Sequence, residues 1–295
     1  MRKKILVTGA NGQVGEELQK LAKSYTSFEF IFTTREQLAL DNPAAIREYI
    51  SNSKPDYLIN CAAYTAVDKA ESEKELAYTI NAEAPKEMAI ACEAGNIQLI
   101  HLSTDYVFNG KGNFPYKEDD ITDPVNLYGD SKLEGEKSII QNNPSAIIIR
   151  TAWVYSEFGK NFVKTMLRLM AEKDQVNVVS DQRGAPTHAA DLAEAIMNII
   201  SNLEISDHQT PGYGGIYHFS NDGNISWYDF AVAIKELSGS NCVVNPIPTS
   251  HFPTPAKRPF YSVLDKTKIQ HRFGIEIKDW KKSLATCIDK IKQKS

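Results

Sequence analysis

Two stretches of the sequence place side chains together that could move a proton. Tyr128 and Lys132 are four residues apart, so in a helix they share one face. A lysine ammonium beside a phenol favours the phenolate and lowers the pKa of the tyrosine, which suits proton exchange with a carbonyl or alcohol oxygen. Thr104 follows an apolar segment and could hydrogen-bond the same oxygen. A packed aromatic ring with a surface lysine is the structural alternative for a Tyr-x-x-x-Lys pair.

A glycine-rich segment near the start of the sequence could hold a phosphate. Gly9-x-x-Gly12-x-x-Gly15 lies between a predicted strand and a predicted helix, the context that a dinucleotide-binding loop requires. Glycines let the backbone approach a pyrophosphate, and the helix N-terminus adds N–H groups and the positive end of its dipole. The first gap is one residue longer than in G-x-G-x-x-G, and a plain turn is the other interpretation.

The end of the second predicted strand bears on the choice of cofactor. A carboxylate there usually binds the ribose hydroxyls of NAD, but this strand ends at Thr33-Thr34-Arg35. Arg35 and Thr34 suit a ribose 2′-phosphate, while the adjacent Glu36 partly offsets the charge. We therefore expect NADPH with a modest preference, NADH also being possible. A solvated loop charge is the alternative interpretation of Arg35.

The elements that must position these residues alternate along the first two thirds of the chain. The sequence predicts strands at 4–8, 28–33, 56–60, 97–103 and 146–151, separated by helices at 13–24, 43–51, 84–94 and 128–141. After about residue 155 the pattern loosens, with helices at 161–172, 191–203, 227–237 and 278–292 and strands at 176–180 and 216–219. Alternating strands and helices indicate βαβ units and a parallel sheet.

We therefore expect an α/β fold, a Rossmann-type doubly wound parallel sheet with a small C-terminal substrate-binding lobe. Residues 1–155 are predicted to form the dinucleotide-binding domain, with a later strand and helices from about 160–203 returning to it. Residues 156–295 are predicted to form mainly the substrate lobe, covering the strand ends where open α/β sheets bind ligands.

Composition and charge restrict the class of function. The 295 residues are 42% hydrophobic and 24% charged, as in ordinary globular proteins. The net charge of −4 argues against a nucleic-acid partner, and no segment approaches the roughly 18 apolar residues of a membrane span. The apolar run behind residues 1–4 is too short for an export signal, so we expect a cytoplasmic location and free cysteines. The cysteine spacing predicts no zinc site.

Together these motifs resemble the extended short-chain dehydrogenases/reductases. That similarity lies in the glycine loop and in Asn60–Ala63, Ser103–Phe108 and Tyr128-x-x-x-Lys132. Four longer segments are similar to the dTDP-4-dehydrorhamnose reductase family, and the similarity runs nearly end to end: Ala63–Glu71, Arg150–Tyr155, Asp181–Thr187 and Pro253–Pro259.

The resemblance implies an NAD(P)H-dependent enzyme that reduces the 4-keto group of dTDP-4-dehydro-6-deoxy-L-mannose. The product, dTDP-L-rhamnose, would serve surface polysaccharide synthesis. By the same resemblance Tyr128 donates the proton, Lys132 lowers its pKa and binds the nicotinamide ribose, and Thr104 assists at the same oxygen. A monomer or a homodimer is expected. Some family members use magnesium at a dimer contact, but no carboxylate cluster here predicts a metal.

The sequence and the resemblance together indicate two sets of binding residues. Besides Tyr128 and Lys132, the cofactor set comprises Gly9, Asn11, Gly12, Gln13, Val14, Thr34, Arg35, Asp41, Ala62, Ala63, Tyr64 and Thr65. The substrate set comprises Thr104, Asp105, Tyr106, Tyr128, Trp153, Asn161 and Arg258. Asp41 is expected to accept from the adenine amino group, and Arg258, helped by Asn161, to bind the diphosphate. The alternatives are helix–sheet packing for Ala62 and Ala63, a purely structural role for Trp153, and a solvated side chain for Arg258.

Two other functions stay open. A non-catalytic regulatory subunit of this fold, as in methionine adenosyltransferase, would keep the glycine loop and relax the sugar site, but Thr104, Tyr128, Lys132 and Trp153 are all present. An epimerase would hold its NAD permanently. A 4,6-dehydratase would need an Asp-Glu pair after the threonine, whereas here Asp105 is followed by tyrosine.

Overall fold

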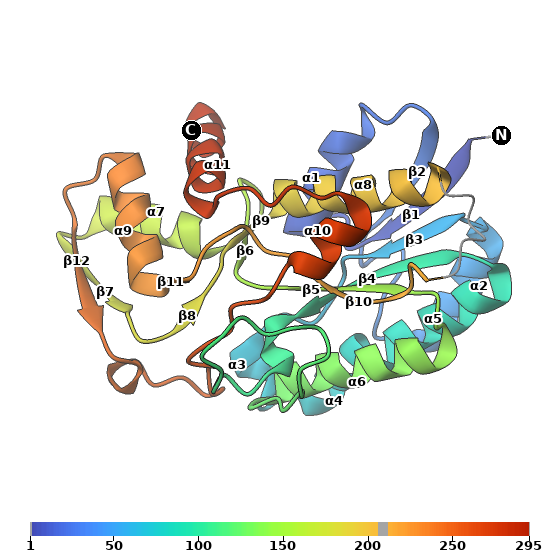
Figure 1. Cartoon of the computed structure of the whole chain (residues 1–295), viewed down its shortest axis with the longest axis horizontal. Coiled ribbons are helices and arrows are strands. Elements are labelled where there is room, and N and C mark those ends of the chain that lie inside the picture. Colours follow the sequence, from blue (N-terminus) through green and yellow to red (C-terminus); the bar gives the residue numbers. More distant parts are fainter. Residues whose placement is uncertain (1, 206–211, 295) are drawn as a thin grey trace.

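A six-stranded parallel sheet forms the centre of the molecule (Figure 1). The computed structural model describes residues 2–205 and 212–294. The strands lie in the order β2-β1-β3-β4-β5-β10, and all neighbours are parallel. Their bounds are β1 Lys3–Thr8, β2 Phe28–Thr33, β3 Tyr57–Asn60, β4 Gln98–Thr104, β5 Ile147–Thr151 and β10 Gly215–His218. The order reverses between β1 and β3, and ligands of such sheets bind outside the strand ends at that point.

Helices cover both faces of the sheet, which confirms the predicted Rossmann-type fold. One face carries α1 (Gln13–Ala22) and α8 (Ala189–Ile205), and the other carries α2 (Pro43–Ser53), α5 (Ala84–Gly95) and α6 (Leu127–Asn142). None of the helices in the described part of the chain is long and apolar enough to cross a membrane.

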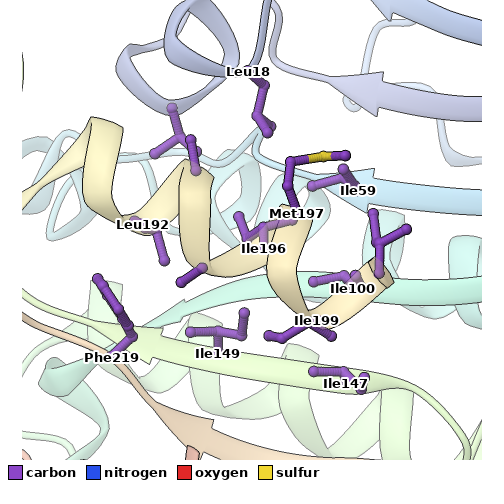
Figure 2. Close-up of a cluster of buried hydrophobic side chains, with 14 of the residues drawn as sticks. Leu18, Ile59, Ile100, Ile147, Ile149, Leu192, Ile196, Met197, Ile199 and Phe219 are labelled. Carbon is purple, nitrogen blue, oxygen red and sulfur yellow. The ribbon is translucent and has the colours of Figure 1, made fainter. Parts of the chain in front are cut away.

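Alternate strand residues fill two separate cores, as expected for a sheet that is covered on both faces. Ile5 and Val7 pack towards α1 and α8, whereas Leu6 packs towards α2 and α5. Figure 2 shows the first of these cores, where side chains of α8 are directed at Ile147 and Ile149 of β5.

A π-helical turn interrupts the helix that precedes β4. The short helix α4 (Lys74–Tyr78) passes through the π-turn η1 (Thr79–Glu83) directly into α5. Asn81 in this turn accepts from the Tyr64 backbone N–H (2.9 Å) and donates to the Ser131 hydroxyl (3.0 Å). The turn therefore ties the loop after β3 to α6, and such π-bulges are frequent at functional sites.

The second lobe is built around a third apolar cluster. Its helices are α7 (Phe162–Glu172), α9 (Trp227–Ser238) and α11 (Trp280–Lys294), and β7 (Gln175–Val179) pairs in parallel with β12 (Val243–Ile247). The other short elements are α3 Val67–Ala70, η2 Asp105–Val107, β6 Val154–Tyr155, β8 Arg183–Gly184, β9 Thr187–His188, β11 Ile225–Ser226, η3 Thr249–His251 and α10 Thr267–Phe273.

We propose a division into a dinucleotide-binding lobe and a substrate lobe that follows these clusters. Within the stretch expected to return to the sheet, α8 packs on it, whereas α7 packs against α9. The strand that returns is β10, and α10 packs against β10 and α8.

A buried ion pair holds α6 on the sheet. Arg150 of β5 and Glu136 of α6 are 2% and 1% exposed, and Nη2 lies 2.7 Å from Oε2. Arg150 Nε also donates to Glu136, Ser103 donates to the same carboxylate, and the guanidinium lies over the Phe108 ring. Because both charges keep their partners, the pair fixes the helix that carries Tyr128 and Lys132.

We expect Glu136→Gln to destabilise the protein strongly, since it leaves the Arg150 charge buried without its partner. Breaking a buried pair in this way costs about 3–5 kcal/mol. The matched control is Glu172→Gln, which breaks an exposed pair with Arg168 and should cost less than about 0.5 kcal/mol. Urea unfolding measures both, and equal losses would show that the buried pair does not hold α6.

Candidate active site

Two glycines of the loop between β1 and α1 are packed too closely to carry a side chain. Gly9 has φ +70°, and a Cβ there would lie 2.8 Å from the Ala62 backbone nitrogen. A Cβ on Gly15 would lie 2.3 Å from the Gly9 carbonyl oxygen. Gly12 at the N-cap of α1 offers no side-chain cap, so the first N–H groups of the helix are available to an anion. The loop thus fits a dinucleotide pyrophosphate.

A cavity of about 680 Å³ runs past this loop along the carboxyl ends of the strands. The structure brings together around it every residue expected to bind the cofactor: Gly9, Asn11, Gly12, Gln13, Val14, Thr34, Arg35, Asp41, Ala62, Ala63, Tyr64, Thr65, Tyr128 and Lys132. The cavity has several further lining residues that were not predicted to bind the cofactor: Leu38, Ser103, Thr151, Val154, Gly159 and Lys160. Ser103, Thr151 and Val154 belong to strand ends that carry the resemblance but were not assigned to the cofactor. Leu38, Gly159 and Lys160 lie between regular elements, where no motif marks them.

Arg35 and Asp41 form an ion pair at the rim of the cavity. Arg35 Nη2 donates to Asp41 Oδ2 at 2.6 Å, and the two side chains are 73% and 35% exposed. Thr34 donates to Glu36, and this hydrogen bond holds the pKa of Glu36 below its usual range. The two residues expected to contact opposite ends of the adenosine moiety are therefore bonded to each other.

Tyr128 lies in the first turn of α6 and reaches the end of β4. Asn126 caps the helix by accepting from the Gly129 backbone N–H at 2.8 Å. Burial raises the pKa of Tyr128 to about 12, and its hydrogen bond with Thr104 opposes the shift. This is the reverse of the direction expected from the spacing of Tyr128 and Lys132, because the Lys132 amine is bonded to β4 instead.

Lys132 is 2% exposed and its amine is held by β4. Nζ donates to the Leu102 carbonyl at 2.7 Å and lies 3.1 Å from His101 Nε2. Burial lowers the pKa of Lys132 to about 8, although the Glu136 carboxylate opposes this shift. The amine can therefore gain and lose a proton near neutral pH.

Asp105 is a buried carboxyl group beside the tyrosine. Burial raises its pKa to about 6, while hydrogen bonds from Ser262 and Thr104 oppose the shift. Thr104 Oγ1 donates to Asp105 Oδ1 at 3.1 Å, and Oδ2 has no hydrogen-bond partner among the residues that the structure describes. Tyr106 packs edge-on against Tyr128, with the ring centroids 5.6 Å apart.

Arg258 lies in the proline-rich loop, residues 253–259, next to Tyr106. Its Nη2 donates to Asp68 Oδ2 at 2.8 Å, and its guanidinium lies 5.9 Å from the Tyr106 ring centroid. Nη1 is buried without a hydrogen-bond partner in ranges 2–205 and 212–294. An unpaired buried N–H group on a cation fits an anionic ligand.

The other two expected substrate residues have structural partners. Trp153 has φ +49° and stacks on Trp227 with 3.6 Å between ring centroids. Asn161 caps α7 through the Lys164 N–H and donates to Gln13 Oε1 at 2.9 Å, next to the glycine loop. Asn161 is therefore not brought to Arg258. Among the described residues, no group of three or more His, Cys, Asp or Glu side chains is arranged to hold a metal ion.

Comparisons with known proteins agree with this geometry. The family model described as the RmlD substrate binding domain matches residues 2–293. A dTDP-4-dehydrorhamnose reductase of Aggregatibacter actinomycetemcomitans is 42% identical over 95% of this chain and 97% of its own. The Escherichia coli protein of that name is 40% identical over 94% of both.

Solved structures of proteins with the same name also match. That from Clostridium acetobutylicum has a TM-score of 0.92 and 42% identity, covering 98% of this chain and 99% of its own. That from Bacillus anthracis, in complex with NADP, has a TM-score of 0.91 and 34% identity, covering 98% of this chain and 100% of its own.

The raised pKa of Asp105 predicts that Asp105→Asn stabilises the protein at neutral pH. The carboxyl has an ordinary value of 3.8 and a folded value of about 6, so folding favours its protonated form. This contribution is fully present below pH 4 and is lost as the pH rises through 6. The asparagine variant should gain up to about 3 kcal/mol at pH 8 and nothing at pH 3.5. Urea unfolding across this range measures the difference, and a gain that does not depend on pH would contradict it.

Proposed function

The chain belongs to the dTDP-4-dehydrorhamnose reductase family, and from this premise we propose that it reduces the 4-keto group of dTDP-4-dehydro-6-deoxy-L-mannose to give dTDP-L-rhamnose. It is an NADP-dependent oxidoreductase. The observation that carries the proposal is that Tyr128 and Lys132 line the same cavity as the glycine loop. A proton donor and a dinucleotide site in one cavity are what a carbonyl reduction needs.

The pyrophosphate of the cofactor would be held by backbone groups rather than by a charged side chain. The N–H groups at the start of α1 suit the pyrophosphate, and Gly9 and Gly15 leave room for it. Bound NADPH supplies the hydride. Leu38 and Leu40 give the rim an apolar wall on the side of Arg35.

Tyr128 would donate the proton that the reduced oxygen needs. A phenol with a pKa of about 12 is fully protonated at neutral pH, so the donor is loaded before the hydride arrives. Thr104 hydrogen-bonds Tyr128 and so holds the hydroxyl at the end of β4. As negative charge grows on the substrate oxygen, the proton moves from Tyr128 to that oxygen.

The sugar nucleotide would lie between η2 and the proline-rich loop. The unpaired Nη1 of Arg258 suits the diphosphate, and the unpaired Oδ2 of Asp105 suits a sugar hydroxyl. Tyr106 contacts both sides of this site, because its ring packs edge-on against Tyr128 and lies under the Arg258 guanidinium. We leave Asn161 out of this set because its amide is used by α7 and Gln13.

Reduction is distinguished from the other functions by net oxidation of the cofactor. A regulatory subunit would bind NADPH without consuming it, and an epimerase would return its hydride to the sugar. Consumption of one NADPH for each 4-keto sugar added, followed by chromatography of the product, supports a reductase. Turnover of the sugar without loss of NADPH would overturn it.

We expect Tyr128→Phe to bind NADPH normally and to lose most of its turnover. General acid catalysis contributes about 10²–10⁴-fold, so kcat should fall within that range. Tyr217→Phe is the control, because Tyr217 is also buried but lies on β10 and donates to the Tyr213 carbonyl. Near-normal kcat in Tyr128→Phe would remove this tyrosine from the chemistry.

Arg258→Ala should raise the KM for the sugar nucleotide and leave the KM for NADPH unchanged. A hydrogen bond from a charged group is worth about 1.5–3 kcal/mol, so KM should rise by about 10- to 150-fold. Arg168→Ala removes an exposed arginine of α7 and serves as the control. An unchanged KM would place the diphosphate elsewhere.

The contact between Arg35 and Asp41 makes the NADPH preference testable in both directions. An exposed contact between Arg35 and the ribose 2′-phosphate, worth about 1 kcal/mol, gives roughly a fivefold preference for NADPH in the wild type. Arg35→Ala should remove it, whereas Asp41→Asn should increase it by releasing the guanidinium. The measurement is kcat/KM with NADPH and NADH, and a preference that Arg35→Ala leaves intact would show that Arg35 does not face the ribose.

A further inference from the structure

A row of buried polar side chains crosses three strands behind Lys132. Thr8 of β1, Asn60 of β3 and His101 of β4 are register partners and are at most 1% exposed. Two residues earlier on the same face of each strand stand Leu6, Leu58 and Leu99. Burying polar groups costs free energy unless they are hydrogen-bonded, so a polar row within an aliphatic core calls for a functional explanation.

The hydrogen bonds of the row run in one direction. The Ala62 backbone N–H can only donate, and it lies 3.2 Å from Asn60 Oδ1, which also accepts from Thr8 Oγ1 at 2.6 Å. Oδ1 therefore faces these two donors, and the amide nitrogen of Asn60 faces His101 Nδ1 at 2.9 Å. Since an amide nitrogen donates, Nδ1 must accept.

This arrangement determines where the imidazole carries its hydrogen. Burial and the neighbouring Lys132 hold the pKa of His101 well below its usual range, so the ring is neutral. A neutral ring that accepts at Nδ1 carries its hydrogen on Nε2. That nitrogen lies 3.1 Å from Lys132 Nζ. An amine accepts such a hydrogen only through its lone pair, which exists only when the amine is neutral.

We propose that Thr8, Asn60 and His101 are positioning residues for Lys132. Thr8 and Asn60 hold His101 in the Nε2–H tautomer, and the His101 ring in that tautomer stabilises the neutral amine of Lys132. This inference rests on the proposed function, because it concerns a residue of the reductive site. Nothing in it depends on which sugar is reduced.

The neutral amine is a state that the reaction produces. After Tyr128 gives its proton to the substrate oxygen, a phenolate remains in the cavity that Lys132 also lines. A proton leaves the Lys132 ammonium and reaches the phenolate through the cavity that both side chains line. The amine keeps the electron pair, and that pair accepts the Nε2–H hydrogen of His101. Uptake of one proton from water restores the ammonium for the next turnover.

The charges that face the amine are compatible with this cycle. Glu136, one turn further along α6, favours the ammonium, but its carboxylate is bonded to Arg150 of β5. His101 faces the amine from β4, and Tyr128 shares its cavity from α6. The amine thus titrates close to neutral pH, and we expect kcat/KM to fall above about pH 8.

The first test reads the tautomer directly. Long-range ¹⁵N–¹H correlation spectra of the wild-type protein at pH 7 should show His101 protonated at Nε2 and bare at Nδ1. His101→Gln assigns the signal by its loss. In Asn60→Asp a carboxylate oxygen replaces the amide nitrogen that faces Nδ1, and this oxygen can only accept a hydrogen bond. The imidazole hydrogen should therefore move from Nε2 to Nδ1. A wild-type ring protonated at Nδ1, or at both nitrogens, would overturn the proposal.

The second test is the pH profile of kcat/KM. In His101→Gln the amide can turn its oxygen to the ammonium, so the alkaline limb should move up by about one pH unit. A limb that stays in place or moves down contradicts the inference, even where kcat falls. If His101→Gln does not fold, Asn60→Asp must show the same upward shift. Failure of the proposed function is a separate outcome, because it appears as wild-type protein that does not oxidise NADPH with the keto sugar.

Discussion

The placement of α6 by the Arg150–Glu136 pair is the constraint on which the site depends. The pair is buried at the level of β5, and Ser103 adds a hydrogen bond from β4. Two glycines let the helix come close: a Cβ on Gly135 would lie 2.1 Å from the Asn81 carbonyl, and one on Gly129 2.2 Å from the Tyr106 carbonyl. Because the helix cannot shift without breaking these contacts, Tyr128 and Lys132 reach the strand ends in a defined position.

Burial also sets the pKa values of the titratable groups in the site. It keeps Tyr128 protonated, brings the pKa of Lys132 down to about 8 and brings that of Asp105 up to about 6. The shifts have one cause, loss of hydration, and opposite signs for the cation and the acids. Tyr128 is accordingly held in the protonated form that can donate a proton. The burial that does this also costs stability, and the Asp105 carboxyl makes that cost measurable.

The sequence predicted the regular part of the fold because apolar periodicity and caps are local signals. The helix expected at 128–141 is α6, and most of the residues predicted to bind the cofactor follow strand ends. Two-residue strands such as β6, the π-turn at Thr79–Glu83, and β12 with its internal Pro246 form only through tertiary contacts. Helix spacing gave the wrong direction for the pKa of Tyr128, and the Arg258–Asp68 pair, 190 residues apart, has no local signature.

In the proposed reaction a hydride passes from NADPH to the 4-keto carbon within this cavity, with Tyr128 as the acid. The most direct measurement uses dTDP-4-dehydro-6-deoxy-L-mannose and NADPH deuterated at the nicotinamide C4 position, prepared separately for each face. One of the two preparations should place one deuterium at C4 of dTDP-L-rhamnose, with an equal amount of NADP⁺ formed. A product without cofactor deuterium from either preparation, or hydrogen exchange with water at another sugar carbon while NADPH stays intact, would contradict it.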